Sequence, residues 1–322
     1  MDLPIKLKEA IQNFSSSLKH ADIINNSKII SDRYRFETGS NKRLLKSSTE
    51  AVSYAISRMP ATYSACYSAL EHTFNLIQQK PKNILDVGAG TGAASWAVSQ
   101  LTDLNSITCL ERESAMLELG GQLMKYISID NKNIKWQQYD LLKDSIAANN
   151  YDLVIASYVL NELTLNDQKI AVKKLWNATD DLLIIVEPGT PKNYEQIKNL
   201  RKILISLGGN LIAPCAHCGE CNIKVGDWCS FSVRVNRSKI HMQSKSGIMS
   251  YEDEKFTYLA FSKKQKPKQI TRVIRHPQYR PKVVELEVCS KDGIKSICIT
   301  KSNKIYKKAR DLKHGDLFAD DI

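Results

Sequence analysis

Short apolar runs recur between residues 81 and 262, and stretches with helix-like periodicity separate them. The runs span 84–87, 107–111, 136–140, 151–157 and 182–187. Nearly continuous apolar runs of this length are typical of strands that a parallel sheet buries on both faces. Strands that alternate with helices predict a doubly wound, Rossmann-like α/β sheet.

Residues 1–80 show a different pattern, in which apolar residues recur at helix-like intervals. The stretch 41–80 has few helix breakers apart from Pro60, which kinks or restarts a helix. We therefore predict an N-terminal helical region over 1–80. Arg58 and Tyr63 flank the proline. They either face a phosphate or a base, or pack between this region and the sheet, and we favour packing.

The pattern changes again after the fifth strand. A helix over 193–207 leads into a cysteine-rich insert at about 213–230, and two further strands are predicted near 231–235 and 257–261. Short strands then follow at 271–275, 283–289 and 293–300. They predict a small antiparallel β module, for which an OB-like barrel is one candidate. We expect a sheet domain with its insert over 81–262 and the β module over 263–322.

The turn after the first strand carries the glycine-rich sequence Asp-x-Gly-x-Gly-x-Gly. Glycines let the chain turn sharply and let a ligand approach the backbone, and a following helix presents free N–H groups. The third glycine comes one residue too early for the dinucleotide fingerprint. The pattern resembles motif I of the class I S-adenosylmethionine-dependent methyltransferases. This resemblance implies cofactor-binding roles for Asp86, Gly88, Ala89, Gly90, Thr91 and Gly92.

Acidic residues end the next two predicted strands. Glu111 ends the second strand, where an acid can accept both ribose hydroxyls of the cofactor. Asp140 and Leu141 end the third, where this family contacts the adenine amine. Each acid alone is more simply a strand-end or capping residue, but together they favour a cofactor site. Asn161 and Glu162 follow the fourth strand as polar groups of the cleft mouth or a helix start, and we assign no catalytic residue.

Composition and charge bound the location and the partners. The chain has 43% hydrophobic and 25% charged residues, no apolar run of membrane-spanning length and no apolar signal core, so we expect bacterial cytosol, or a mitochondrion in a eukaryote, and no membrane. The net charge is +12, and residues 263–322 hold 12 lysines and 4 arginines against 7 acids, a net charge of +9. This concentration either indicates an RNA partner or reflects the lysine-rich surface of a low-GC genome. The candidate RNA contacts are Arg234, Arg237, Arg272, Arg275, Lys282, Lys307, Lys308 and Arg310.

Four of the eight cysteines fall within fifteen residues of the insert. They are Cys215, Cys218, Cys221 and Cys229, and His217 lies among them. Disulfides are unexpected in a chain without a secretion signal, so we predict a metal site. Thiolates bind either Zn²⁺ in a tetrahedral site or an iron–sulfur cluster, and the spacing does not decide between them.

Several motifs beyond residue 50 together resemble one family. They are Arg58-x-Pro-Ala-Thr-Tyr63, the glycine loop followed by Trp96, Pro-Cys-x-His-x-x-x-Cys, Asp-Trp-Cys-x-Phe-Ser-Val-Arg-Val, Tyr251-Glu-Asp-Glu-Lys-Phe256-x-Tyr258-Leu-Ala and the segment 309–316. The chain is similar to the mitochondrial small-ribosomal-subunit methyltransferase-like family, which includes methyltransferase-like protein seventeen and bacterial relatives. The resemblance implies a methyltransferase fold, a role in maturation of the small ribosomal subunit, and that subunit and its rRNA as partners.

The family resemblance also implies a [4Fe–4S] cluster, with Zn²⁺ as the alternative. Its ligands map onto Cys215, Cys221, Cys229 and the distant Cys289, and Cys218 stands where the family commonly has another residue. We favour Cys289 over Cys218 as the fourth ligand. Two functions stay open: an S-adenosylmethionine-dependent rRNA methyltransferase, and a non-catalytic assembly factor that binds the cofactor and rRNA. A zinc-binding RNA methyltransferase outside this family is a third option.

Overall fold

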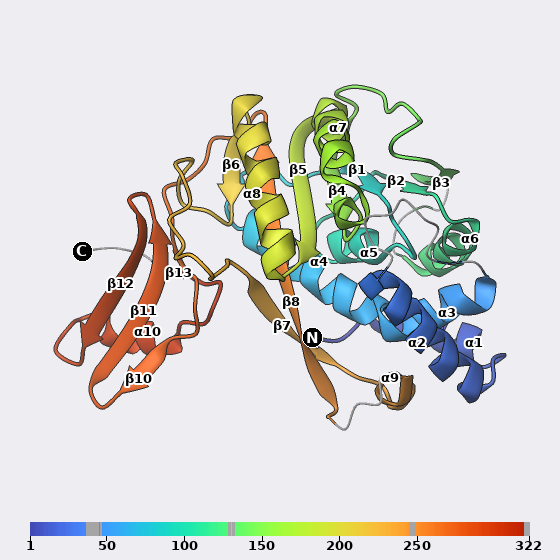
Figure 1. Ribbon diagram of the computed structural model, residues 1–322, viewed down its shortest axis with the longest axis horizontal. Helices are drawn as coiled ribbons and strands as arrows, with labels where there is room; N and C mark the ends of the chain where they lie inside the picture. The colour runs from blue at the N-terminus through green and yellow to red at the C-terminus, as the bar shows by residue number, and fades with distance from the viewer. Residues whose placement is uncertain (37–44, 46, 128–129, 131–132, 245–248, 319–322) are drawn as a thin grey trace.

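The computed structural model describes residues 1–36, 45, 47–127, 130, 133–244 and 249–318. An eight-stranded sheet forms the centre of the molecule, with the strand order β3-β2-β1-β4-β5-β8-β6 and with β7 paired to β8 (Figure 1). The strands are β1 (Asn83–Val87), β2 (Ser106–Glu111), β3 (Ile134–Gln138), β4 (Tyr151–Ser157), β5 (Thr179–Pro188), β6 (Asn210–Ala213), β7 (Phe231–Asn236) and β8 (Tyr251–Ser262). The α/β sheet predicted from the apolar runs is therefore confirmed.

Strands β1 to β5 run parallel, which brings their carboxyl ends to one edge of the sheet. Asp86 lies opposite Cys109 on one side and Ile155 on the other. Strand β8 is antiparallel to both β5 and β6, so it reverses the direction of the sheet at this end. Its first half extends beyond β5 and pairs with β7 to form a long hairpin.

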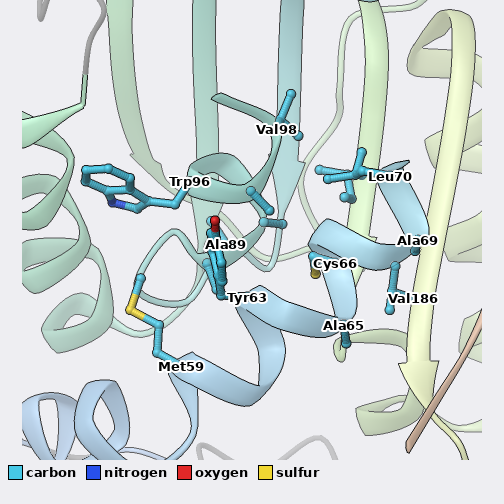
Figure 2. Packing of buried hydrophobic residues seen from close by; sticks show 14 of the residues in the cluster. Met59, Tyr63, Ala65, Cys66, Ala69, Leu70, Ala89, Trp96, Val98 and Val186 are labelled. Carbon is cyan, nitrogen blue, oxygen red and sulfur yellow. The ribbon is translucent and has the colours of Figure 1, made fainter. Parts of the chain in front are cut away.

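Two layers of helices cover the sheet. One layer contains α4 (Met59–Phe74) and α5 (Ala93–Ser99), and the other contains α7 (Leu165–Ala178) and α8 (Pro191–Ser206). Figure 2 shows how α4 packs its apolar side chains against α5 and the sheet. Alternate strand residues face opposite layers: Ile84 belongs to the α4 side, and Leu85 to the α7 side. Burial on both faces explains why the strand runs are continuously apolar.

Local signals set the beginnings of these helices. The hydroxyl of Thr164 accepts a hydrogen bond from the backbone N–H of Asp167 at the start of α7, and Thr190 does the same for α8. Pro60 lies in the first turn of α4, where a missing N–H costs nothing. The proline therefore starts α4 directly after α3 (Ser48–Ser57), as the sequence predicts for a restarted helix.

The N-terminal region forms a helical layer beside the sheet domain. It contains α1 (Ile5–Ser15), α2 (His20–Phe36) and α3, and it packs against α6 (Ser114–Leu123) and α9 (Lys239–Ser244). Two 3-10 turns, Met124–Tyr126 and Leu160–Glu162, follow α6 and β4 in the sheet domain. Throughout the described ranges, no helix combines the length and the apolar character needed to cross a membrane.

The C-terminal residues form a separate antiparallel sheet beside the main one (Figure 1). Its elements are β9 (Thr271–Val273), β10 (Gln278–Arg280), β11 (Val283–Ser290), β12 (Gly293–Thr300), α10 (Tyr306–Asp311) and β13 (Leu317–Phe318). Strand β11 pairs with β12 along one edge and with β10 and β9 along the other, and β9 pairs with β13. An OB-like assignment for this sheet stays a prediction.

Two arginines that the sequence offered as RNA contacts instead join this module to the insert. Arg272 is 1% exposed, and it donates to the carbonyls of Pro214 and Gly315. Arg275 forms an ion pair with Asp227 at 2.6 Å. The RNA role predicted for Arg272 is therefore wrong, because its guanidinium is buried between the two parts of the molecule.

Candidate cofactor and cysteine sites

The glycine loop joins β1 to α5 through backbone conformations that favour glycine. Gly88, Gly90 and Gly92 have φ of +68°, +57° and +86°. A Cβ on Gly88 would lie 2.5 Å from Cγ2 of Val159, so this position excludes side chains both by conformation and by space. At Gly90 the nearest atom to such a Cβ is Cε of Met116 at 3.4 Å, which leaves the backbone open toward a ligand.

Asp86 holds the glycine loop through hydrogen bonds to the start of α5. It does not line the cavity beside the loop. Its Oδ2 accepts hydrogen bonds from the backbone N–H of Ser95 at 3.0 Å and from the Ser95 hydroxyl at 2.7 Å. Complete burial raises the pKa of Asp86 to about 6, although the two bonds from Ser95 oppose the shift. Ala89 and Thr91 are also buried in the turn. These three residues shape the loop that would meet a cofactor.

A cavity of about 90 Å³ lies at the carboxyl ends of β1, β2 and β4. Gly88, Gly90, Glu111, Asp140 and Leu141 all line it, so the structure brings these predicted residues together. This is the position at which open α/β sheets bind ligands, where the strand order reverses from β1 to β4.

Glu111 anchors the glycine loop at the cavity wall. Its Oε2 accepts the backbone N–H of Gly90 at 2.7 Å, and its Oε1 accepts the N–H of Glu113 at 2.8 Å. Burial raises the pKa of Glu111, while these backbone bonds lower it. A carboxylate oxygen has more than one lone pair, so the group that holds the loop can also accept a ligand hydroxyl.

Asp140 lies in the loop that follows β3. Its Oδ1 accepts the N–H of Leu142 at 3.0 Å, and Lys143 lies 3.4 Å from Oδ2. Burial acts to raise the pKa of Asp140, but the bonds from Leu142 and Lys143 outweigh it and lower the pKa. The carboxylate therefore stays ionised beside the apolar side chain of Leu141, which suits recognition of a flat base that carries an amino group.

The N-terminal region closes the cavity from the side opposite the sheet. Tyr34, Leu45 and Tyr54 line it, and the rings of the two tyrosines lie 6.0 Å apart. These residues were not among the predicted ones, because no local motif links a helix near residue 34 to a loop near residue 90. Only the tertiary packing of this region reveals their position.

Polar side chains after β4 and β5 complete the region around this cavity. Tyr158, with φ of +57°, donates its hydroxyl to Glu254 at 2.7 Å. Glu162 lines the cavity, and burial raises its pKa to about 8. Glu187, which is 1% exposed, accepts the N–H of Leu160 at 2.9 Å, and burial likewise raises its pKa to about 8. A cationic ligand would favour the ionised forms of these acids.

The second site is a cavity of about 40 Å³ between the insert, α8, β8 and the C-terminal module. Cys215, Cys221, Cys229 and Cys289 all line it, whereas Cys218 does not and is exposed. The four lining thiols come from two parts of the sequence about sixty residues apart. The structure thus brings together the four cysteines that the family resemblance implied as ligands.

Neighbouring groups hold the insert in place around this cavity. The Tyr194 hydroxyl lies 3.1 Å from Sγ of Cys221. The guanidinium of Arg201, on α8, donates to the carbonyls of His217 and Gly219 at 2.5 Å and 2.9 Å. Burial raises the pKa of the Cys215 thiol to about 12. The conformation of the insert therefore depends on α8 as well as on its own sequence.

The donor set of the second cavity can be compared with the groups that thiolates bind. A single Zn²⁺ with bonds of about 2.3 Å requires four donors within about 4 Å of one another. Among the described residues, no three histidine, cysteine or acidic side chains come close enough to hold one metal ion. Four thiols around a shared cavity are chemically suited to a larger cluster, whose iron atoms each take one thiolate.

Comparison with known proteins shows which sequences this chain is similar to. The chain is 24% identical over 286 residues to the human protein named "Ribosome assembly protein METTL17, mitochondrial", an alignment that covers 80% of this chain. The chain spans 61% of the length of that curated relative.

Two methyltransferases are among the solved structures that the chain matches. One is magnesium protoporphyrin IX methyltransferase from Synechocystis with bound S-adenosylmethionine, at a TM-score of 0.41 and 15% identity, covering 74% of this chain and 96% of the other. The other is an S-adenosylmethionine-dependent methyltransferase from Aquifex aeolicus, at a TM-score of 0.42 and 12% identity, covering 68% and 99%.

The family described as "Mitochondrial small ribosomal subunit Rsm22" matches residues 48–319. The matched segment includes the glycine loop, the cysteine-rich insert and nearly all of the C-terminal module, and most of the lining residues of both cavities lie within it. The chain therefore belongs to the Rsm22 family.

Proposed function

We propose that this protein acts in maturation of the small ribosomal subunit as an S-adenosylmethionine-dependent rRNA methyltransferase that carries an iron–sulfur cluster. The observation that carries the proposal is the cavity at the carboxyl ends of the parallel strands, where Gly90, Glu111 and Asp140 meet. Membership of the Rsm22 family and the name of the human relative, a mitochondrial ribosome assembly protein, support the small ribosomal subunit as the partner. The expected compartment is wherever that subunit matures, the bacterial cytosol or a mitochondrion.

We assign the cofactor contacts from the groups that line this cavity. The backbone at Gly90 would lie against the amino-acid portion, because the nearest atom to its Cβ position is Cε of Met116 at 3.4 Å, and Gly88 lines the same cavity. Glu111 would accept the ribose hydroxyls, and Asp140 with Leu141 would hold the adenine. Asp86 acts indirectly, since its bonds to Ser95 fix the loop.

S-adenosylmethionine supplies an electrophilic methyl group on a positively charged sulfur. The protein's part is to exclude water and to hold an RNA nucleophile in line with that methyl group. Tyr34 and Tyr54 restrict access of water from one side of the cavity. The Tyr158–Glu254 pair and Glu162 lie beside the loop after β4, where an incoming base would be oriented. We assign no general base.

The cysteine cavity would hold the cluster through Cys215, Cys221, Cys229 and Cys289. Zn²⁺ is the weaker alternative, because the described side chains offer no close group of donors for a single ion. The shared cavity and the long sequence separation of Cys289 support a structural role. A cluster there would tie the β module to the insert and to α8.

The exposed cations of the C-terminal module are the proposed rRNA contacts. Lys282, Lys307, Lys308 and Arg310 are all exposed. Contacts of this kind neutralise phosphates and release counterions. Binding of the protein to rRNA should therefore weaken steeply as the salt concentration rises.

The alternative function is a non-catalytic assembly factor that binds S-adenosylmethionine and rRNA. One specific observation favours it. Side chains of the N-terminal region, Tyr34, Leu45 and Tyr54, line the cavity and so reduce the room for an incoming base. In this alternative the bound cofactor stabilises the fold that meets the immature subunit, and no methyl group is transferred.

Methyl transfer separates the two functions. The protein is prepared without oxygen and incubated with labelled S-adenosylmethionine and immature small subunits from a strain that lacks it. We expect label in the rRNA. The Gly90→Asp variant, which adds a carboxylate at the cavity, should transfer none.

The matched control for this experiment is Gly208→Asp. Gly208 also has a positive φ, +79°, but no atom lies within 4 Å of the place that its Cβ would take, and the residue follows α8 far along the chain from the loop. Wild-type protein that binds the subunits but transfers no label would favour the assembly-factor function. Wild-type protein that neither binds the subunits nor transfers label would contradict both functions.

A further inference from the structure

A third cavity, of about 540 Å³, lies between α2, the end of α3 and the segment from β7 to α9. It shares no lining residue with the cofactor cavity or the cysteine cavity. Its lining consists almost entirely of hydroxyl and cationic groups. These residues are Ser27, Lys28, Ser31, Asp32, Arg35, Ser57, Arg58, Arg237 and Ser244. We call this cavity the basic pocket.

The charges that face the basic pocket leave a positive excess. Lys28, Arg35 and Arg58 have no ion pair within the described residues, whereas Arg237 pairs with Glu252 at 2.5 Å. Asp32 is the one acid in the described lining. With Arg237 neutralised by Glu252, three cations face one acid, so the pocket favours an anion.

The cations and hydroxyls of α2 are arranged by the period of the helix. Ser27, Ser31 and Arg35 follow one another at intervals of four, and Lys28 lies beside them. Residues four apart lie on the same face of a helix. One face of α2 therefore presents two hydroxyls and two cations to the same cavity.

Two buried donors in the basic pocket lack partners within the described part of the protein. Ser27 is 5% exposed, and its Oγ makes no hydrogen bond there. Nε of Arg237 is also buried without an acceptor. An unpaired buried donor destabilises the folded state, because it has lost its hydrogen bonds to water. Both donors point to an acceptor that belongs to a ligand.

A cation–π contact links one residue of the basic pocket to one residue of the cofactor cavity. The guanidinium of Arg58 lies 5.8 Å from the centre of the Tyr34 ring, and Tyr34 lines the cofactor cavity. Arg58 is itself a lining residue of the basic pocket. An anion bound by Arg58 would thus be connected to the cofactor cavity through Tyr34.

We propose that the basic pocket binds a backbone phosphate of RNA next to the cofactor cavity. Guanidinium, ammonium and hydroxyl donors around an anion are the usual partners of phosphate oxygens. The inference rests on the proposed function, since a phosphate held here positions an RNA strand beside the cofactor. It adds a contact of the helical layer that is separate from the cations of the C-terminal module.

The test compares two double charge reversals in the full-length protein. Lys28→Glu with Arg35→Glu alters two exposed cations of the basic pocket. The control, Lys6→Glu with Lys19→Glu, makes the same change in charge at exposed positions of the same helical region that line none of the three cavities. Affinity for a labelled single-stranded RNA of about twelve nucleotides is measured by fluorescence anisotropy over a range of salt concentrations.

We expect the pocket variant to bind this RNA at least about tenfold more weakly and the control at most about threefold more weakly. The slope of log affinity against log salt should fall by about 0.7 for each phosphate that the variant no longer neutralises. Equal weakening of RNA binding in both variants, or no binding of RNA by the wild type, would contradict the inference.

The second experiment measures the melting temperature of each variant with and without inorganic phosphate. Stabilisation that disappears only in the pocket variant, with RNA binding intact, would assign the pocket to free phosphate and overturn the RNA proposal.

Ser27→Ala distinguishes a ligand role from a structural one. Because the hydroxyl has no partner in the described part of the protein, its removal should leave the melting temperature unchanged or slightly raised while RNA affinity falls about two- to fivefold. A lower melting temperature with unchanged affinity would contradict a ligand role. Binding of the wild type to small subunits, measured separately, tests the proposed function. If the wild type binds small subunits but both pocket variants keep their affinity for RNA, only the proposal for the basic pocket is contradicted.

Discussion

The cofactor cavity and the cysteine cavity are built in opposite ways. The cofactor cavity is lined by backbone and acids from consecutive strands and loops between residues 87 and 163, together with three residues of the N-terminal region. The cysteine cavity combines α8, the insert, β8 and β11, and its lining is apolar apart from the thiols and a few polar groups. They have no lining residue in common.

This difference shows which kind of bond holds each site. Around the cofactor cavity, the loop is already held by protein hydrogen bonds, as Glu111 to Gly90 and Asp86 to Ser95 show. Around the cysteine cavity, the thiols themselves make few bonds, and Arg201 and Arg272 hold the surrounding backbone. We therefore expect a ligand of the cofactor cavity to bind a loop that is already held in place. A group bound by the four thiols of the cysteine cavity should instead cross-link the segments around it and so raise the free energy of unfolding.

The largest effect is expected at the cysteine cavity. Cys289→Ser should abolish the visible absorbance of the proposed cluster and most of the bound iron, because it would remove the proposed ligand on β11. Cys218→Ser and Cys298→Ser should leave the absorbance unchanged, since both residues are exposed and line neither cavity. Absorbance that survives in Cys289→Ser but disappears in Cys218→Ser would show that Cys218, and not Cys289, is the fourth ligand.

Gly88→Ala should have the next largest effect, confined to the cofactor cavity. The new Cβ would lie 2.5 Å from Cγ2 of Val159 at a φ of +68°, so we expect a loss of about 2–3 kcal/mol in unfolding free energy. Affinity for S-adenosylmethionine should fall at least about tenfold by calorimetry. Gly208→Ala, at φ +79° with open space around it, should lose only about 1 kcal/mol and no affinity. Equal losses of affinity would show that the effect is not local.

A smaller effect should appear in the pH dependence of stability. Burial raises the pKa of Glu187 from 4.5 to about 8, so between these values the folded protein binds a proton that the unfolded chain has released. Stability contributed by this group is therefore lost as the pH rises through that range. Glu187→Gln keeps the shape of the side chain and removes the titration.

Urea unfolding at pH 5 and pH 8 measures this effect. The Glu187→Gln variant should match the wild type at pH 5 and exceed its stability by about 1–3 kcal/mol at pH 8. A variant that is less stable at both pH values would show instead that the carboxylate of Glu187 is ionised and needed by the N–H of Leu160.

Local patterns in the sequence predicted most of the sheet domain. The apolar run at 151–157 is β4 in full, and the predicted helix over 193–207 is α8 displaced by one or two residues. The third strand differs, because β3 ends at Gln138 and Asp140 lies in the following loop. Apolar strand runs and helix ends are predictable from the sequence, because residues nearby in the chain decide their conformation.

Long-range packing is what the sequence did not reveal. Tyr34 and Tyr54 enter the cofactor cavity from helices without a motif, and Arg272 is buried although arginine usually marks a surface. Cys289 is the exception, since family resemblance rather than spacing connected it to the insert. The basic pocket likewise joins α2 to a segment about two hundred residues later.

Binding of labelled S-adenosylmethionine to wild-type and Cys289→Ser protein, by equilibrium dialysis without oxygen, tests whether the two cavities hold different groups independently. We predict that the wild type binds the cofactor and that Cys289→Ser, although it lacks iron, binds it with an affinity within about threefold. Loss of cofactor binding together with the iron would show that the two sites depend on each other. No binding by the wild type would contradict the assignment of the cofactor cavity itself.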